Sequence, residues 1–224
     1  MADMPVLSVA AGRGDLIVQC AETDAQDEQD AEIVQALIKV GADVKATNEA
    51  GYTALHGAAY GGHSAVGRVL LEAGASVDAK TKDGVSPLHS AAIGCRTEMV
   101  RLLLSAGAGV DSRDGRNSTP LHWAVPKGHC VQVVEALIQA GADVNAVEDA
   151  FGDSPLMSAT QFCSSGTEQI VADLLDAGAN PLIANRRREN AVSRASSAHC
   201  GNAQVYRMIA ERARLFLGSS GQNF

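Results

Sequence analysis

The sequence predicts a mainly α-helical solenoid, in which helix-turn-helix units are stacked and linked by β-hairpin-like loops. Two periodic markers predict this fold class. A Gly-Ala pair recurs at intervals of 33, 33, 34 and 37 residues, starting at Gly41, Gly74, Gly107, Gly141 and Gly178. A Thr/Ser-Pro/Ala-Leu segment recurs with nearly the same period, starting at Thr53, Ser86, Thr119 and Ser154. Two independent markers with one period indicate a chain built from repeated structural units.

The composition agrees with closely packed helices and restricts the function. Of the 224 residues, 46% are apolar and 22 are Gly, but only 8 (1 Trp, 3 Tyr and 4 Phe) are aromatic. This apolar content excludes a disordered polyelectrolyte. The net charge of −8 disfavours binding to nucleic acid, whose phosphates require clustered positive charge. We therefore expect no nucleic-acid partner.

The first helix of each unit is short. In the segment that starts at Ser86, the hydroxyl is the expected N-cap, and Pro87 occupies the first helical position, where its missing N–H costs nothing. Ala91 and Ala92 follow at the centre of this helix. Their small side chains allow a second helix to pack closely against it.

The second helix of each unit shows apolar residues at spacings of three and four, such as Met99, Val100, Leu103 and Leu104. It is expected to end at the Gly of the Gly-Ala pair in a left-handed conformation, where a Cβ would cost ~1–2 kcal/mol. Between units, an Asp-Gly pair in a polar stretch, as at 83–84, predicts a tight hairpin.

These residues resemble the ankyrin repeat, whose signature includes Thr-Pro-Leu-His-x-Ala, as in the segment 119–124, and a period of 33. The resemblance implies one domain over 1–217 with a flexible tail at 218–224. It divides the domain into six units: 1–47, 48–80, 81–113, 114–148, 149–184 and 185–217. The first unit is recognised from Leu7–Ala11, and the sixth is degenerate, as expected for the ends of a stacked array.

The first unit carries about 15 extra residues, which coincide with the acidic segment 21–30. This segment holds five acidic and no basic residues. It is interpreted either as a solvated surface loop that joins two helices or as an acidic recognition loop.

No motif for catalysis is found. The chain lacks the G-x-S-x-G elbow, the phosphate-binding loop and the H-E-x-x-H pair. His56, His89 and His122 recur at the position where the ankyrin resemblance implies hydrogen bonds that tie neighbouring units together. No four-ligand cluster has zinc spacing. We expect no catalytic residue, no metal and no cofactor, and thus no enzyme.

Asn145 is a candidate for modification. The segment Asp143-Val144-Asn145, with Leu137 before it, resembles the consensus that asparaginyl hydroxylases accept in ankyrin hairpins. The alternative is an Asn that simply suits the turn.

The ankyrin resemblance implies a concave groove that binds other proteins, formed by the hairpin tips and the exposed face of each first helix. Alignment of the units places these residues in it: Tyr52, Tyr60, Lys82, Asp83, Val85, Ile93, Arg116, Trp123, Lys127, Phe151, Gln161, Phe162, Arg186 and Arg187. Five of the aromatic residues fall in this set, which is typical of a binding hot spot. The alternative for some of them, above all Trp123, is packing against the next unit.

Basic residues on the groove side, with the run Arg186–Arg188, favour a partner segment in which acidic residues flank an apolar or aromatic anchor. The alternative for the run is solvation of the terminal unit. The leading hypothesis is a non-catalytic protein–protein interaction module: an adaptor, scaffold, assembly chaperone or inhibitor. The alternative is a substrate-recognition or regulatory subunit of an enzyme complex such as a ubiquitin ligase.

The remaining expectations concern the compartment. Five widely spaced cysteines without a C-x-x-C pair favour free thiols in a reducing cytoplasm or nucleus. The N-terminal residues lack a secretory signal, and no apolar run reaches the ~18 residues of a membrane helix. A monomer is expected.

Overall fold

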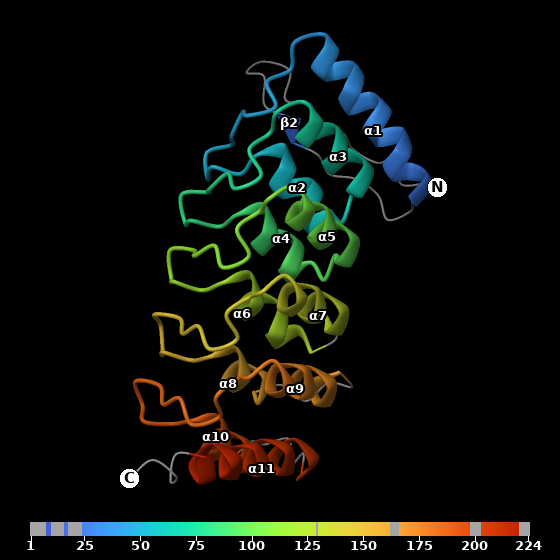
Figure 1. Cartoon of the computed structure of the whole chain (residues 1–224). Helices are drawn as coiled ribbons and strands as arrows, with labels where there is room; N and C mark the ends of the chain where they lie inside the picture. Colours follow the sequence, from blue (N-terminus) through green and yellow to red (C-terminus); the bar gives the residue numbers. More distant parts are fainter. Residues whose placement is uncertain are drawn as a thin grey trace, which may run out of the picture. The chain divides into compact units, whose positions relative to one another are not determined.

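The structure, a computed structural model, describes residues 8–9, 16–17, 24–128, 130–161, 166–197 and 203–219. It divides into two compact units, Met1–Gly115 and Arg116–Phe224, and each is described by itself. Helices dominate both units, and each pair of neighbouring helices is followed by a long loop (Figure 1). The predicted mainly α-helical fold is therefore confirmed.

Among the described residues of unit 1, two short strands precede five helices. They are β1 (Ser8–Val9), β2 (Leu16–Ile17), α1 (Asp24–Lys39), α2 (Ala54–Gly61), α3 (Ser64–Glu72), α4 (Pro87–Ile93) and α5 (Thr97–Ser105). The strands are antiparallel, with Ser8 opposite Ile17. The first helices α2 and α4 pack together, and the second helices α1, α3 and α5 pack in sequence beside them.

The described part of unit 2 repeats this arrangement. Its elements are α6 (Pro120–Ala124), the 3₁₀ helix η1 (Val125–Lys127), α7 (Val131–Gln139), α8 (Pro155–Ala159), α9 (Thr167–Asp176), α10 (Ala191–Ser197) and α11 (Ala203–Ser219). The first helices α6, α8 and α10 form one layer, and the second helices α7, α9 and α11 form the other.

Each first helix starts as its sequence predicts. Ser86 is extended, with φ −101° and ψ 165°, and Pro87 occupies the first turn of α4. Leu88 follows and is completely buried, as are Leu55 in α2, Leu121 in α6 and Leu156 in α8. The Leu that recurs in the sequence is thus a core residue in α2, α4, α6 and α8.

The second helices end at the predicted glycines. Gly74 has a φ of +89°, and its N–H donates to the carbonyl of Leu71 at 3.0 Å. The next N–H, of Ala75, reaches back to Leu70 at 2.9 Å. This pair of bonds satisfies carbonyls that the helix end leaves open, in the geometry that requires a left-handed residue.

Small residues allow successive second helices to approach closely. A Cβ on Gly67 of α3 would lie 2.6 Å from the methyl carbon of Met99 in α5, and 3.3 Å from a methyl carbon of Leu102. The backbone of α3 therefore packs directly against side chains of the next repeat.

The loops between repeats are turns without assigned strands in the described residues, but backbone bonds connect their tips. In unit 1, Lys82 N–H donates to Ala50 O at 3.0 Å. In unit 2, Arg186 N–H donates to Phe151 O at 2.9 Å. These bonds hold each loop tip against the next.

The N-terminal repeat differs from the sequence prediction. Residues 24–30 of the acidic segment are not a loop, because they form the first two turns of α1. The carboxylate of Asp27 accepts the N–H of Ala65 at 2.8 Å and thereby caps the start of α3. Ser8 and Val9, in the segment from which the first unit was recognised, form strand β1. Residues 21–23 lie outside the described part of the chain.

The C-terminal helix is longer than predicted. Ala213 stands where the other second helices have their terminal Gly, so α11 does not stop there and continues to Ser219. Residues 218 and 219 are therefore helical rather than part of a tail, and residues 220–224 lie outside the described part.

The prediction of free thiols is also wrong for two cysteines. Cys95 and Cys130 are both disulfide-bonded. The sequence spacing of the cysteines does not reveal this bonding. The cysteine argument for a reducing compartment therefore fails.

No described helix combines the length and the apolar character that crossing a bilayer requires.

Candidate functional site

In unit 1, the predicted groove residues include two well-exposed tyrosines. Tyr60, in the last turn of α2, is 60% exposed, and Tyr52, at a loop tip, is 40% exposed. The ring of Tyr52 lies edge-on to His56, with centroids 5.4 Å apart. Arg96 Nε donates to the carbonyl of Tyr60 at 3.1 Å. Both tyrosines are thus held on an ordered backbone while their rings face solvent.

The other unit 1 candidates divide by burial. Lys82 and Asp83 are exposed at a loop tip, and Ile93 in α4 is half-buried. Val85 differs from the prediction, since its side chain is only 5% exposed. Its N–H donates to Thr81 Oγ1 at 3.1 Å, and its carbonyl accepts from His56. Val85 belongs to the core of the loop and has no surface for a partner.

In unit 2, the candidates at the loop tips contact one another. Phe151 is 48% exposed, and the guanidinium carbon of Arg187 lies 4.8 Å from the centre of its ring. Arg186 forms a solvent-exposed ion pair with Asp149 at 3.9 Å. The result is an exposed aromatic ring with a cation stacked on it and a second cation beside it.

The remaining unit 2 candidates are less uniform. Arg116 is exposed at a loop tip, and Trp123 in α6 is half-buried. Gln161 is exposed, but its amide donates to Asp153 at 3.3 Å. The side chain of Lys127 and the whole of Phe162 lie outside the described residues.

The recurring histidines have structural contacts. His56 Nδ1 accepts from the hydroxyl of Thr53 at 2.8 Å and from the backbone N–H of Thr53 at 3.2 Å. Its Nε2 donates to Val85 O in the next repeat at 3.1 Å. His122 repeats this geometry, with Nδ1 on Thr119 and Nε2 on Asp153 O at 3.2 Å. These rings connect repeats and have no nitrogen left for chemistry.

Burial lowers the pKa of His56, and the repulsion from Lys80 acts in the same direction, whereas bonds to the carbonyls of Val85 and Ala79 oppose the change. The neutral ring is the form that the contacts require, because Nδ1 must accept the N–H of Thr53.

Asn145 connects two loops of unit 2. Its amide donates to Gly178 O at 3.2 Å, and its carbonyl accepts the N–H of Asn180 at 2.7 Å. Asp78 occupies the same place in unit 1 and accepts the N–H of Gly109 at 3.1 Å. These contacts support the structural interpretation of Asn145, while its hydroxylation stays a prediction.

Sequence reasoning missed a polar cluster around Asp153. Its buried carboxylate accepts from Asn185 at 2.8 Å and forms a two-pronged ion pair with Arg194 of α10. Arg194 also bonds Glu189 at 2.8 Å. A signal in the sequence could have pointed to it: Met157 and Ser193 replace the recurring His. This replacement removes the hydrogen bond from the His ring to the next repeat and leaves that role to other side chains.

The charges of this cluster reinforce one another. The hydrogen bond from Arg194 lowers the pKa of Glu189, assisted by the bond from Asn185. Burial alone would lower the pKa of Arg194, but its bonds to Asp153 and Glu189 outweigh burial and raise it. The cluster is therefore an ion-pair network that favours the charged forms of Glu189 and Arg194.

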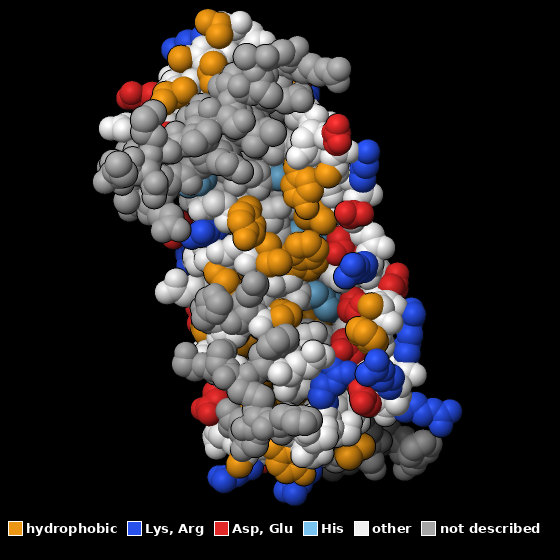
Figure 2. Space-filling model, turned by 180° about the vertical axis from the view of Figure 1, so that it is seen from behind, with side chains coloured by type: hydrophobic (Ala, Val, Ile, Leu, Met, Phe, Trp, Pro, Cys, Tyr) orange, Lys and Arg blue, Asp and Glu red, His pale blue; other side chains and the backbone are white. Residues whose placement is uncertain are grey.

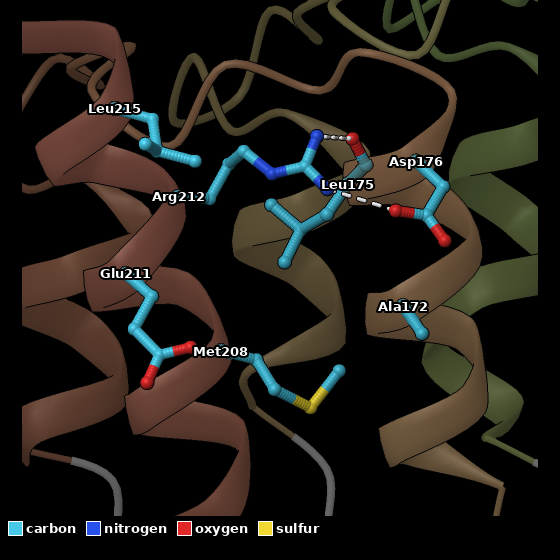
Figure 3. Close-up of a pocket in the computed structure, with 7 residues that line it drawn as sticks. All are labelled: Ala172, Leu175, Asp176, Met208, Glu211, Arg212 and Leu215. Carbon is cyan, nitrogen blue, oxygen red and sulfur yellow. Dashed lines mark hydrogen bonds and ion pairs between the residues drawn. The ribbon is translucent and has the colours of Figure 1, made fainter.

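A pocket of about 360 Å³ lies between α9 and α11, lined by Ala172, Leu175, Asp176, Met208, Glu211, Arg212 and Leu215 (Figure 3). Arg212 donates to Leu175 O at 2.6 Å and to Asp176 at 2.8 Å, so it caps the end of α9. Its cation is thus already satisfied, and the lining offers no nucleophile paired with a base. Within the described residues, no group of three or more His, Cys, Asp or Glu could hold a metal ion.

Comparison with known proteins agrees with the geometry. A family model described as ankyrin repeats (3 copies) matches residues 17–114 and 106–185, which together cover most of the chain. A search of curated proteins found no match.

Proposed function

The chain belongs to the ankyrin-repeat family, whose members are generally protein–protein interaction modules, and we propose that it is a non-catalytic adaptor or scaffold that binds a partner protein through its loop tips and first helices. The family is also typically non-catalytic.

One observation carries this proposal: Phe151 is half-exposed with Arg187 stacked on its ring at 4.8 Å. About half of the Phe151 side chain lies in solvent, outside the buried core. Aromatic and Arg side chains are the residues that dominate the binding energy of protein interfaces. The backbone bond from Arg186 to Phe151 holds this pair in place before a partner arrives, which reduces the entropy lost on binding.

The charges around this ring indicate the chemistry of the partner. Arg186, Arg187 and Arg188 are exposed in one loop, and Arg116 is exposed in another loop of the same unit. A partner segment with an apolar or aromatic anchor flanked by acidic residues complements this surface. In unit 1, Tyr52 and Tyr60 supply a second exposed aromatic surface on corresponding elements.

The second candidate function is a recognition subunit of an enzyme complex such as a ubiquitin ligase. It uses the same surface, so the identity of the captured proteins distinguishes the two. Recovery of ligase components favours the second candidate, and their absence favours the first.

The test is quantitative affinity purification from the native cell with the wild-type chain and with the triple variant Tyr60→Ala, Phe151→Ala and Phe162→Ala. We expect the variant to fold and to capture its specific partner several-fold less, because an aromatic anchor in a binding surface contributes ~1 kcal/mol or more to binding.

Tyr206→Ala is the matched control. Tyr206 is 40% exposed, as Tyr52 is, but lies on α11, a second helix. The Tyr206→Ala variant should capture the partner as the wild-type chain does. Unchanged capture by the triple variant would refute the assignment of the binding surface.

A further inference from the structure

The loop tips of unit 2 carry arginines and an aromatic ring at corresponding positions. Arg116, Phe151 and Arg187 each lie four residues before the first residue of the following first helix, α6, α8 or α10. Backbone bonds join the three tips, because Asp149 N–H donates to Arg116 O at 2.8 Å and Arg186 N–H donates to Phe151 O at 2.9 Å. The ring of Phe151 therefore has an arginine at the same position of the tip on either side.

The last of these tips holds three consecutive exposed arginines, Arg186, Arg187 and Arg188. The ion pair of Arg186 with Asp149 measures 3.9 Å, which is too long for a hydrogen bond. The guanidinium of Arg187 lies over the ring of Phe151 and forms no hydrogen bond with a described residue. The side chain of Arg188 has neither a hydrogen bond nor an ion pair within the described part of the chain. All three guanidinium groups thus keep N–H donors for a ligand.

The exposure of these side chains is a property of the tip position. In unit 1, Lys82 and Asp83 are exposed as well, although another tip follows theirs and Gly115 N–H donates to Asp83 O at 2.6 Å. Figure 2 shows Lys and Arg side chains gathered with acidic and hydrophobic ones on the side where the loops of unit 2 project (lower right).

Arg188 occupies a backbone position that favours glycine. Its φ is +62°, and the corresponding residues Gly51, Gly84 and Gly152 have φ values of +87°, +72° and +75°. A long side chain is uncommon in this left-handed region, and residues kept there are found most often at functional sites. Because the Arg188 side chain bonds no described residue, its conformation favours a role in binding over a role in folding.

Asn185 holds the tip in place before any ligand arrives. Its buried side-chain oxygen accepts the N–H of Arg187 and the N–H of Glu189, both at 2.9 Å. Its backbone carbonyl accepts the N–H of Arg188 at 2.9 Å. The backbone of the tip is therefore ordered, which reduces the entropy lost when the arginine side chains bind.

The carboxylates near the tip are mostly engaged elsewhere. Glu148 accepts the N–H of Phe151 at 2.7 Å, while Glu189 and the buried Asp153 both pair with Arg194. Among the described ion pairs, Asp149 alone pairs with an arginine of the tip. The tip is thus locally basic on a chain whose net charge is −8. Such a surface suits a compact anion better than an extended anionic polymer, which the remaining acidic surface repels.

We propose that this surface binds a phosphorylated side chain of the partner protein, with the phosphate on Arg187 and Arg188 and an aromatic anchor of the partner against Phe151. The inference rests on the proposed function and names the anion that the partner presents. A phosphate monoester carries about −1.5 to −2 charges at pH 7 and three acceptor oxygens, so it can bond two guanidinium groups at once. A carboxylate carries one charge and matches the fork of one guanidinium. Phosphorylation of the partner therefore regulates its capture.

The test uses two short peptides that supply a phosphate and an aromatic ring together, acetyl-Ala-phosphotyrosine-Ala-amide and acetyl-Phe-phosphoserine-Ala-amide. NMR titration of the full chain follows the backbone resonances of 148–152 and 185–189. We expect at least one phosphopeptide to bind at least about fivefold more tightly than acetyl-Ala-Tyr-Ala-amide and acetyl-Phe-Glu-Ala-amide, because its added charge engages a second guanidinium.

Two results of this titration overturn the proposal. If the Glu peptide binds as tightly as the phosphopeptides, the surface recognises carboxylates, and the proposed function stands with an acidic partner. If neither phosphopeptide shifts these resonances, phosphate recognition fails, whereas the proposed function is decided separately by capture with the aromatic variants.

Variants identify the residues that bind the phosphate. Arg187→Gln with Arg188→Gln should weaken phosphopeptide binding at least about tenfold, because it removes both charge-assisted contacts. Arg207→Gln with Arg214→Gln makes the same charge change at exposed positions of α11 and should bind as the wild-type chain does. Phosphopeptide binding that survives the first double variant overturns the proposal.

Arg188→Gly separates binding from folding. Glycine suits the φ of +62°, so this variant should unfold at the same temperature as the wild-type chain or a higher one, yet bind the phosphopeptide several-fold more weakly. A variant that binds as tightly as the wild-type chain overturns the proposal.

Inorganic phosphate and lipid vesicles distinguish the source of the phosphate group. Inorganic phosphate lacks the aromatic anchor and should bind more weakly than the phosphopeptide, and equal binding would reveal an adventitious ion only and overturn the proposal. Vesicles of phosphatidylcholine and phosphatidylserine should not sediment with the chain, because an anionic surface repels its net charge of −8. Sedimentation that depends on Arg187 and Arg188 would assign the tip to membranes and overturn the proposal.

Discussion

His56 shows how one side chain connects two repeats. The ring is buried, bonds Thr53 in its own repeat and reaches Val85 O in the next. Protonation adds a hydrogen at Nδ1 and so breaks the bond that this atom accepts from the N–H of Thr53, whereas Nε2 still donates to Val85 O. The chemistry that suits His to this place also makes it sensitive to acid.

Unit 1 should lose stability as pH falls below about 6.5, the ordinary pKa of His. The folded-state pKa of His56 is lower, so the unfolded chain binds its proton first. The stability that neutral His56 contributes is fully present above the ordinary pKa. It disappears as pH falls towards the lower pKa of the folded state. Urea unfolding between neutral pH and about pH 5 measures it. A His56→Gln variant should lose ~1–3 kcal/mol and show a shallower pH dependence, and equal slopes for both chains would contradict the assignment.

Gly67 tests the packing of α3 on α5. In a Gly67→Val variant, the new Cβ would lie 2.6 Å from the methyl carbon of Met99. We expect a loss of about 1–3 kcal/mol in unfolding free energy, despite the better helix propensity of Val over Gly. Arg68→Val, at an exposed neighbouring position of the same helix, is the control and should change stability by less than about 0.5 kcal/mol.

For single residues, the sequence predicts the positions that recur in each repeat. Leu88 and His56 could be placed because their neighbours recur in each unit. Asp153 and Arg194 could not, because their contact joins residues 41 positions apart, where Met157 and Ser193 replace the recurring His. Val85 was misplaced because alignment of the units does not show which loop side chains turn inward.

At the scale of elements, Arg194 attaches α10 to the preceding loop through Asp153. The Asp153 side chain is only 5% exposed, so removal of Arg194 leaves a buried carboxylate without its cation. Arg194→Ala should therefore destabilise the last repeat by ~3–5 kcal/mol. Hydrogen exchange of α10 and α11 measures this loss. Arg214→Ala, which removes an exposed Arg, should leave exchange unchanged, and equal effects of the two variants would contradict the role of the cluster.

Asn145 makes the corresponding connection between two loops. Asn145→Ala should remove both bonds to the loop that starts at Gly178 and cost ~1–2 kcal/mol. Asn145→Asp keeps the acceptor for Asn180 but loses the donor, so its stability should lie between those of the Ala variant and the wild-type chain. Thermal unfolding ranks the three chains. An Ala variant as stable as the wild-type chain would contradict this account.

The sequence predicted most helices but misjudged both ends. The acidic segment was expected to be a loop because it lies outside the periodic pattern, yet Asp27 finds a helix start to cap and the segment continues α1. At the other end, the domain was expected to stop at residue 217, but Ala213 stands where the other second helices have their Gly, and α11 continues to Ser219.

At the scale of the whole molecule, stability in a repeat protein is roughly a sum of local terms and nearest-neighbour terms. Among the described second helices, α1 packs against α3 alone and α11 against α9 alone, and they expose Ile33 and Tyr206. Native-state hydrogen exchange at low concentration should therefore show α1 and α11 opening before α3, α5 and α7. Earlier opening of α3 and α5 would contradict the additive description.

The central claim is that the chain binds a partner protein through its exposed loop tips and first helices. Site-specific photo-crosslinking in the native cell tests it most directly, with the crosslinker placed at Tyr60, at Phe151 and, as a control, at the exposed Glu98 of α5. The account predicts that positions 60 and 151 capture the same protein and position 98 does not. Capture at position 98 alone, or of nothing at positions 60 and 151, would contradict it.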